Sequence, residues 1–290
     1  MKSNTNDQVY LTECPRDAMQ GIKEWIPTAS KANYINQLIR TGFDTIDFGS
    51  FVSPKAIPQM KDTAEVLNLL DLDNFKGSLL AIVANTRGAY NAVEHKPIDI
   101  LGYPFSISET FQLRNTNATI EKSLYRVADI QSIAIKNEKK LLIYISMGFG
   151  NPYGDEWNVQ IVIQWVKSLY AMGIRHISLS DTIGVSTPES IRYLFSNLIP
   201  QFPDMTIGAH LHTTPHTWKE KIEAAYQSGC RHFDGAILGY GGCPMAKDEL
   251  TGNMPTEHMV SYFKNHGALN DLNQDAFDRS LQLAQDLFPH

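Results

Sequence analysis

The sequence has 290 residues, of which 43% are hydrophobic and 19% are charged, and its formal net charge at pH 7 is −6. This is a globular composition, and the length fits one large α/β domain or two small ones. The negative charge argues against a strongly basic nucleic-acid-binding surface, and no apolar run approaches the roughly 20 residues of a membrane-spanning helix. We therefore expect neither a nucleic-acid partner nor a membrane partner.

Eight short apolar runs alternate along the chain with longer amphipathic segments. The strand candidates are residues 9–14, 45–50, 79–85, 98–105, 141–147, 176–181, 206–212 and 232–238. Helices are expected between them, among them one capped by Ser30, one opening with Ser53 and Pro54, and one opening with Thr187 and Pro188. Two further helices are expected after the eighth strand.

Consecutive strand–helix units without a linker of altered composition predict an α/β fold, a (β/α)8 TIM barrel with extra C-terminal helices. We expect a single domain over 1–290, with the barrel at about 9–240, a catalytic loop at about 239–253 and C-terminal helices at about 256–287. The alternative is an open doubly wound sheet, but no Gly-x-Gly-x-x-Gly phosphate loop follows the first strand. A barrel places its active site at the carboxyl ends of its strands.

Polar residues gather at those strand ends. The seventh strand ends in His210 and His212, two positions that share one face of a strand. Asp17 follows the first strand, and two imidazoles with one carboxylate suit a divalent cation that keeps open positions for a substrate. The alternatives are ordinary strand-end polarity for the histidines, and a helix cap or a partner of Arg16 for Asp17.

The cysteines indicate both a compartment and a candidate catalytic thiol. Three cysteines are few and odd in number, which argues against a disulfide framework; with no apolar signal core at the N-terminus, we expect a cytoplasmic protein. Cys243 lies among glycines that indicate a mobile loop, which fits poorly with a packed core position. Cys230 is expected to be structural, and Cys14 to lie near the site without taking part.

The segments CPRDAMQ, DTIDFGSFVSPKAIPQM, ISLSDTIGVSTP, AHLHT and LGYGGCPMAKDELTGN resemble the 3-hydroxy-3-methylglutaryl-CoA (HMG-CoA) lyase family. The resemblance extends from about residue 9 to about residue 265, and SFVSPKAIPQM and GGCP are specific to this lyase branch. It implies a carbon–carbon lyase that cleaves HMG-CoA to acetoacetate and acetyl-CoA. It also implies a divalent cation, Mg²⁺ or Mn²⁺, as cofactor, an acyl-CoA as substrate and a homodimer as assembly.

The resemblance further implies roles for individual residues. The implied metal ligands are Asp17, His210, His212 and Asn253. The implied catalytic positions are Arg16, Asp17, His210 and Cys243, with Arg16 facing the enolate oxygen of acetyl-CoA and Cys243 returning a proton to the enolate carbon. Substrate-binding positions are Gln20, Asp47, Ser50 and Thr182, and Lys55 matches a coenzyme A contact.

Some positions depart from the pattern of the resembled family. Asp47 stands where the family usually has glutamate, and Thr213 and Thr214 stand where it usually has Asp-Thr, which removes a carboxylate near the metal. These departures leave the exact acyl-CoA substrate open. The alternatives are a related aldolase, a condensing enzyme similar to isopropylmalate or homocitrate synthase, and a non-catalytic paralogue that binds a CoA ester.

Overall fold

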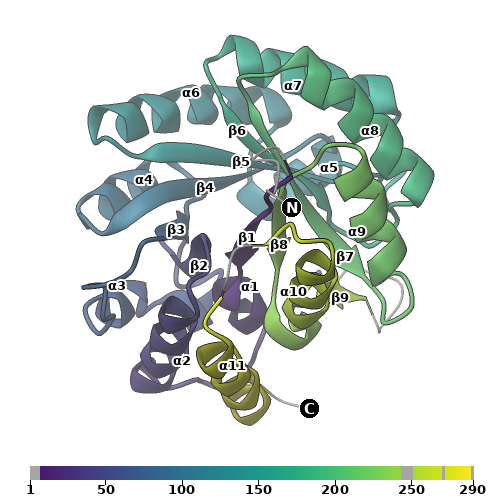
Figure 1. Ribbon diagram of the computed structural model, residues 1–290. Coiled ribbons are helices and arrows are strands. Elements are labelled where there is room, and N and C mark those ends of the chain that lie inside the picture. The colour runs from purple at the N-terminus through teal and green to yellow at the C-terminus, as the bar shows by residue number, and fades with distance from the viewer. Residues whose placement is uncertain (1–6, 243–250, 270–271, 289–290) are drawn as a thin grey trace.

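The structure is a computed structural model that describes residues 7–242, 251–269 and 272–288. Parallel strands form a closed barrel surrounded by helices (Figure 1), because β6 pairs with β7 as well as with β5 and so completes the ring. The strands are β1 (Tyr10–Glu13), β2 (Thr45–Ser50), β3 (Ser78–Ile82), β4 (Ile98–Ser106), β5 (Lys140–Ser146), β6 (His176–Asp181), β7 (Thr206–Thr213) and β8 (His232–Gly235). The predicted (β/α)8 barrel is confirmed.

Most of the helices that follow the strands cover the outside of the barrel. The helices are α1 (Pro15–Gln20), α2 (Thr28–Thr41), α3 (Thr63–Leu67), α4 (Thr86–Val93), α5 (Glu109–Thr116), α6 (Ile120–Lys136), α7 (Val159–Ala171), α8 (Pro188–Gln201) and α9 (Trp218–Gln227). By contrast, α1 and α5 contribute residues to the cavity at the end of the barrel. Two short 3₁₀ turns are η1 (Pro58–Met60) and η2 (Ile237–Gly239). In the described part of the chain no helix is long and apolar enough to cross a membrane.

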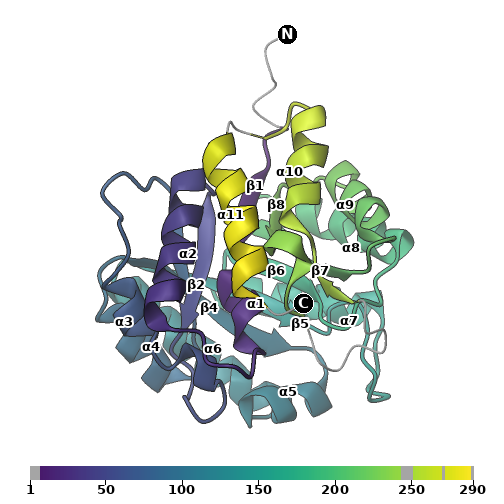
Figure 2. The ribbon, with the colours of Figure 1, turned by 90° about the horizontal axis from the view of Figure 1, so that it is seen from below.

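The two predicted C-terminal helices are present as α10 (Thr256–Asn265) and α11 (Gln274–Leu287). Figure 2 shows α11 lying along α2, so the end of the chain packs against its beginning. Gln37 of α2 donates its Nε2–H to the carbonyl oxygen of Ala276, 3.0 Å away. This contact joins segments that lie far apart in the sequence on the outside of the barrel.

Two predicted helix starts are wrong. Helix α2 begins at Thr28, directly after Pro27, so Ser30 lies inside the helix and does not cap it. Ser53 and Pro54 begin no helix, and the chain there forms turns before η1 and α3. The reason lies in Pro58, because a proline disfavours helical backbone at the residue before it, and Ile57 has φ −130° and ψ 80°. Thr187 caps α8 as predicted, accepting a hydrogen bond from the backbone N–H of Ser190.

Two features near the site differ from the predicted strands: the end of β8 and an additional short strand. Strand β8 stops at Gly235, and the remainder of the predicted strand 232–238 contains the 3₁₀ turn η2. The sequence analysis missed the short strand β9 (Gly252–Asn253), which runs antiparallel to β7. Both features redirect the chain over the carboxyl ends of the strands.

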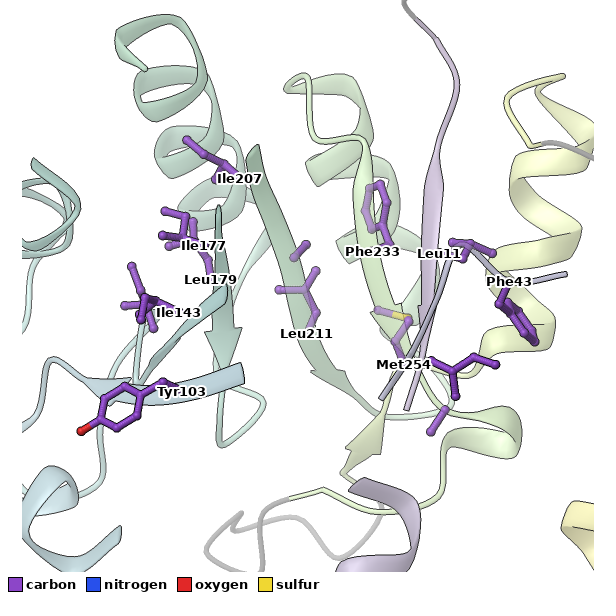
Figure 3. Close-up of a cluster of buried hydrophobic side chains, with 14 of the residues drawn as sticks. Leu11, Phe43, Tyr103, Ile143, Ile177, Leu179, Ile207, Leu211, Phe233 and Met254 are labelled. Atoms are coloured by element: carbon purple, nitrogen blue, oxygen red, sulfur yellow. The ribbon is translucent and has the colours of Figure 1, made fainter. Parts of the chain in front are cut away.

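The core follows the alternation of the strands. Leu79 and Ala81 of β3, and Val83 just after it, belong to the large apolar cluster that also includes side chains from the helices. Figure 3 shows part of this cluster. Leu80 and Ile82, which point to the other face, form a separate small cluster with Tyr144 of β5. The barrel therefore has a packed interior, as expected for this fold, and its polar groups concentrate at one end.

The buried side chain of Glu13, at the end of β1, binds residues on both sides of the predicted catalytic loop at 239–253. Glu13 is 0% exposed, and its two carboxyl oxygens accept hydrogen bonds from the backbone N–H of Ile237 (2.9 Å) and from Thr256 Oγ1 (2.5 Å). Burial raises the pKa of Glu13 to about 8, against the lowering effect of these two hydrogen bonds. The carboxyl group is therefore mostly protonated at neutral pH.

We expect Glu13→Gln to reduce the pH dependence of stability. The folded state binds the Glu13 proton more tightly than the unfolded chain, so its contribution is complete below about pH 4.5 and is lost as the pH rises through about 8. Glutamine keeps the shape, can accept from the Ile237 N–H through Oε1 and can donate through Nε2 to Thr256 Oγ1, and it does not titrate. Between about pH 5 and about pH 8, the free energy of unfolding of the variant should fall less than that of the wild type, by about 3 to 4 kcal/mol. Urea unfolding measures this difference, and parallel curves for the two proteins would contradict it.

Candidate active site and metal centre

The structure brings Asp17, His210 and His212 together at the carboxyl ends of β1 and β7. One ligand atom from each side chain lies within 4.8 Å of the others. The two histidines come from alternate positions of β7, and their ring centroids are 5.4 Å apart. Asp17 lies in α1, which follows β1 directly and is the reason this carboxylate reaches the histidines. We call these three residues the metal group.

A hydrogen bond at Nδ1 orients each histidine of the metal group. His210 Nδ1 lies 3.2 Å from Asp234 Oδ2, and His212 Nδ1 lies 3.0 Å from the carbonyl oxygen of Thr182. Among the described side chains, His212 Nε2 is one of two buried polar atoms without a hydrogen-bond partner. A buried nitrogen without a partner is costly unless something occupies its lone pair. The donor set and this nitrogen therefore fit a divalent cation.

The charge states of Asp17 and His212 suit the same role. Burial raises the pKa of Asp17, but Arg16 and His210 outweigh this effect and lower it to about 2. Burial and the neighbouring His210 lower the pKa of His212 to about 4. A carboxylate and a neutral imidazole are the forms in which these side chains bind metals.

Strand β9 places Asn253 beside the metal group. Asn253 pairs with His212 across the β7–β9 ladder, and its Nδ2 donates to Asp17 Oδ2 (2.7 Å) and to the carbonyl oxygen of Tyr240 (2.8 Å). Its amide oxygen, Oδ1, is the atom that could bind a cation. The structure thus puts Asn253 in the expected place, and its role as a ligand stays a prediction.

Arg16 lies next to the metal group in a buried network of charges. Its Nε and Nη2 donate to Asp47, with Nη2 2.5 Å from Oδ2, and its Nη1 donates to Asp17 Oδ1 (2.8 Å) and Gln20 Oε1 (2.9 Å). Burial lowers the pKa of Arg16, but the carboxylates of Asp47 and Asp17 outweigh it and raise the pKa above its usual value. The guanidinium is therefore a fixed positive charge.

The shorter side chain of Asp47 does not break its contact with Arg16. Asp47 is 0% exposed, and both of its oxygens accept hydrogen bonds from the guanidinium. Burial raises the pKa of Asp47 to about 6, although Arg16 opposes this effect. In the structure this carboxylate lies behind the guanidinium and orients it.

The metal group opens into a cavity of about 440 Å³. The predicted residues that line it are Arg16, Asp17, Gln20, Thr182, His210 and His212. Apolar side chains also line it, namely Val52, Ile57, Ile82, Pro104 and Phe111. The cavity thus combines the charged metal group with apolar lining residues, which suits a substrate with both polar and apolar parts.

Other predicted residues lie at or beyond the edge of this cavity. The hydroxyl group of Ser50 lies near the backbone of Ile82 and Val52, and Ser50 is not among the lining residues. Lys55 is exposed in the turn after β2. The hydroxyl group of Thr213 bonds to Thr214 and Thr217 at the start of α9. The roles predicted for Ser50 and Lys55 stay predictions.

Cys243 lies outside the described residues, but the chain leading to it is part of the site. Gly242 lines the cavity, and Gly241 has φ +85°, a conformation that side chains rarely adopt. A Cβ atom on Gly241 would lie 2.7 Å from the carbonyl oxygen of Asp17. Glycine is therefore required where this segment crosses the end of β1. Cys14 and Cys230 are both free and buried, as expected for thiols without a catalytic role.

The sequence analysis missed two residues of the site, Tyr144 and Asp234. Tyr144 lines the cavity, its buried hydroxyl has no hydrogen-bond partner, and its ring meets the His210 ring edge-on at 5.5 Å between centroids. Asp234 accepts from Ser178 Oγ (3.1 Å) and contacts His210. A tyrosine and an aspartate inside apolar strand runs were the available signals, because buried polar groups need a partner.

With this geometry established, comparison with known proteins gives the family. A family model described as HMGL-like matches residues 9–283. The chain belongs to this HMGL-like family. It is 36% identical over 247 residues to hydroxymethylglutaryl-CoA lyase YngG of Bacillus subtilis, which is 85% of this chain and 81% of that protein. It is 35% identical over 257 residues to a cytoplasmic 3-hydroxy-3-methylglutaryl-CoA lyase of Rattus norvegicus, covering 88% of this chain and 74% of the relative.

Solved structures agree with the sequence relatives. A structure of an HMG-CoA lyase from Acinetobacter baumannii in complex with coenzyme A and 3-methylmalate has a TM-score of 0.90 at 30% identity. The match covers 98% of this chain and 92% of that one. The resemblance predicted from the sequence motifs is confirmed, and the family and these relatives support the predicted enzyme class, a carbon–carbon lyase.

Proposed function

We propose that the protein is a hydroxymethylglutaryl-CoA lyase, which cleaves HMG-CoA into acetoacetate and acetyl-CoA. The observation that carries this proposal is the meeting of the metal group with the Arg16–Asp47 pair at one cavity. An acyl-CoA substrate is supported by the HMG-CoA lyase that was solved with coenzyme A and covers nearly the same length of chain.

The proposed cofactor is Mg²⁺ or Mn²⁺, held by Asp17, His210 and His212, with Asn253 as a further ligand. The carboxylate and amide oxygens are the donors that these hard ions prefer, and the two imidazoles suit a transition-metal ion such as Mn²⁺ better than Mg²⁺. When bound, such a cation lowers the pKa of a substrate hydroxyl group and polarises a neighbouring carboxyl oxygen. Asp234 and the Thr182 carbonyl contribute by fixing the direction of the two imidazoles.

Arg16 is proposed to stabilise the charge that develops when the carbon–carbon bond breaks. In this step the substrate's hydroxyl group gives its proton to a base, its oxygen becomes the ketone of acetoacetate, and the electron pair of the broken carbon–carbon bond forms a thioester enolate, whose oxygen carries negative charge. The guanidinium is already oriented by Asp47 and Gln20 and already desolvated, so it needs no reorganisation to meet this oxygen. The apolar residues that line the cavity lower the local dielectric constant and strengthen this interaction.

Cys243 is proposed to return a proton to the enolate carbon. We expect Cys243→Ser to lower kcat by about 100-fold or more, because a serine hydroxyl is a much weaker acid than a thiol. The affinity for Mn²⁺ should stay the same, because the proposed ligands are Asp17, His210, His212 and Asn253. Steady-state kinetics and calorimetry measure the two quantities. A variant with the wild-type kcat would remove Cys243 from the mechanism.

An assay with the purified protein tests the proposed function. HMG-CoA, Mg²⁺ and a thiol reductant are incubated with the protein, and acetoacetate is measured, with a chelator in a parallel sample. We expect acetoacetate that depends on the cation. Absence of product with metal present and the thiol protected would contradict the proposal and favour a different acyl-CoA or a binding role.

The cellular compartment and the oligomeric state are supported by fewer observations. We propose a cytoplasmic protein because Cys14 and Cys230 are buried free thiols, as is usual in a reducing compartment. The homodimer and the division of the chain into one domain over 1–290 stay predictions.

A further inference from the structure

Helix α9 carries a lysine that is almost completely buried behind the metal group. Lys221 is 2% exposed. Its Nζ donates to Asp181 Oδ2 (2.8 Å), to the carbonyl oxygen of His212 (2.8 Å) and to the carbonyl oxygen of Gly184 (3.2 Å). An ammonium group has three donors, so these three acceptors use its full capacity. Lys221 therefore joins the end of β6, the turn after it and the end of β7.

These contacts hold His212 at two points. Lys221 binds its backbone carbonyl, and the carbonyl oxygen of Thr182 binds its ring at Nδ1. Both contacts involve the segment 181–184, because Thr182 belongs to it and Lys221 also binds Asp181. Asp181 in addition accepts hydrogen bonds from the backbone N–H (3.1 Å) and the hydroxyl group (2.5 Å) of Ser186. These hydrogen bonds thus orient both the main chain and the ring of His212, and they leave its Nε2 without a hydrogen-bond partner.

We propose that Lys221 is a positioning residue of the metal centre, which fixes the main chain of His212 so that Nε2 is held ready for the cation. The inference rests on the proposed cation site and goes beyond it, because Lys221 contacts none of the ligand atoms. Groups that orient metal ligands in this way typically change metal affinity by about 10–100-fold when they are removed.

The alternative role of Lys221 is to compensate the buried charge of Asp181. Removing only the lysine would leave that carboxylate without its cation and could destabilise the whole protein. The double variant Lys221→Met with Asp181→Asn separates the two roles, because it removes both charges together. It restores charge balance but not the hydrogen bond to the His212 carbonyl.

A second buried lysine provides a matched control. Lys31 is also 2% exposed; it forms an ion pair with Asp62 (2.7 Å) and donates to the carbonyl oxygen of Gln59. None of its partners belongs to the metal group. The double variant Lys31→Met with Asp62→Asn therefore removes the same kind of buried pair from a different part of the barrel.

The test is the affinity for Mn²⁺, measured by calorimetry and by the loss of the free-ion EPR signal, with thermal unfolding recorded for each protein. We expect the Lys221/Asp181 double variant to bind Mn²⁺ about 10–100-fold more weakly than the wild type, and the Lys31/Asp62 double variant to bind within about twofold of it. Wild-type affinity in the Lys221/Asp181 variant, or an equal loss in both double variants, would overturn the inference. A wild type that binds no Mn²⁺ would overturn the proposed cation site itself.

A single variant keeps the inference testable if the double variant does not fold. Lys221→Gln retains an amide donor for the His212 carbonyl, whereas Lys221→Met retains none. We expect the glutamine variant to bind Mn²⁺ more tightly than the methionine variant. Equal affinities in these two variants would contradict the positioning role.

Discussion

Arg16→Lys is expected to lower kcat for HMG-CoA cleavage by about 100-fold, which corresponds to about 3 kcal/mol of transition-state stabilisation. Lysine keeps a positive charge, but one ammonium group cannot replace a planar fork that contacts Asp47, Asp17 and Gln20 at the same time. The loss should appear in kcat more than in KM, because the proposed interaction forms as the enolate develops.

Lysine is the informative replacement because an uncharged side chain would leave Asp47 buried without a cation. Asp47 is 0% exposed, so Arg16→Met would combine a catalytic loss with a loss of stability. Thermal unfolding and Mn²⁺ affinity of Arg16→Lys are measured in parallel, because Arg16 also contacts buried Asp47 and the proposed ligand Asp17, and both should change less than kcat. A kcat within a few-fold of the wild type would show that the guanidinium does not stabilise the transition state.

His210→Ala is expected to abolish cation binding and activity together, with a loss of Mn²⁺ affinity of about 100-fold or more. The change removes one of the two imidazoles and leaves Asp234 with Ser178 but without its imidazole partner. Calorimetric titration with Mn²⁺ and the acetoacetate assay should report losses of similar size. Activity that survives in the absence of measurable binding would separate His210 from the cation.

His232 provides the matched control for this change. It lies at the first position of β8, away from the carboxyl ends of the strands, and its ring stacks on Tyr10 at 4.7 Å between centroids. His232→Ala removes an imidazole from the same barrel without touching the metal group. We expect its Mn²⁺ affinity to match the wild type.

The part of the site that could be predicted from the sequence is the part that local geometry determines. His210 and His212 are separated by one residue on a strand, so their shared face follows from the period of the strand. Asp17 follows the first strand directly, and the barrel fold brings the carboxyl ends of all strands to one face. The metal group was therefore predictable once eight strands had been recognised.

The remaining contacts depend on pairings that no local pattern specifies. Asn253 reaches His212 through a strand of two residues, and Asp234 reaches His210 from the neighbouring strand β8. Lys221 stands next to charged residues in the sequence, and its burial follows from the packing of α9 against the ends of β6 and β7. The helix predicted to open at Ser53 failed because Pro58 interrupts it, a local signal that was overlooked.

The most direct test of a single cation held jointly by β1 and β7 is an anomalous difference map from crystals grown with Mn²⁺. We predict one strong peak within coordination distance, about 2.0–2.3 Å, of a carboxyl oxygen of Asp17 and of a ring nitrogen of both His210 and His212. A map with no peak among these three side chains, or with Mn²⁺ bound by other residues, would contradict the account.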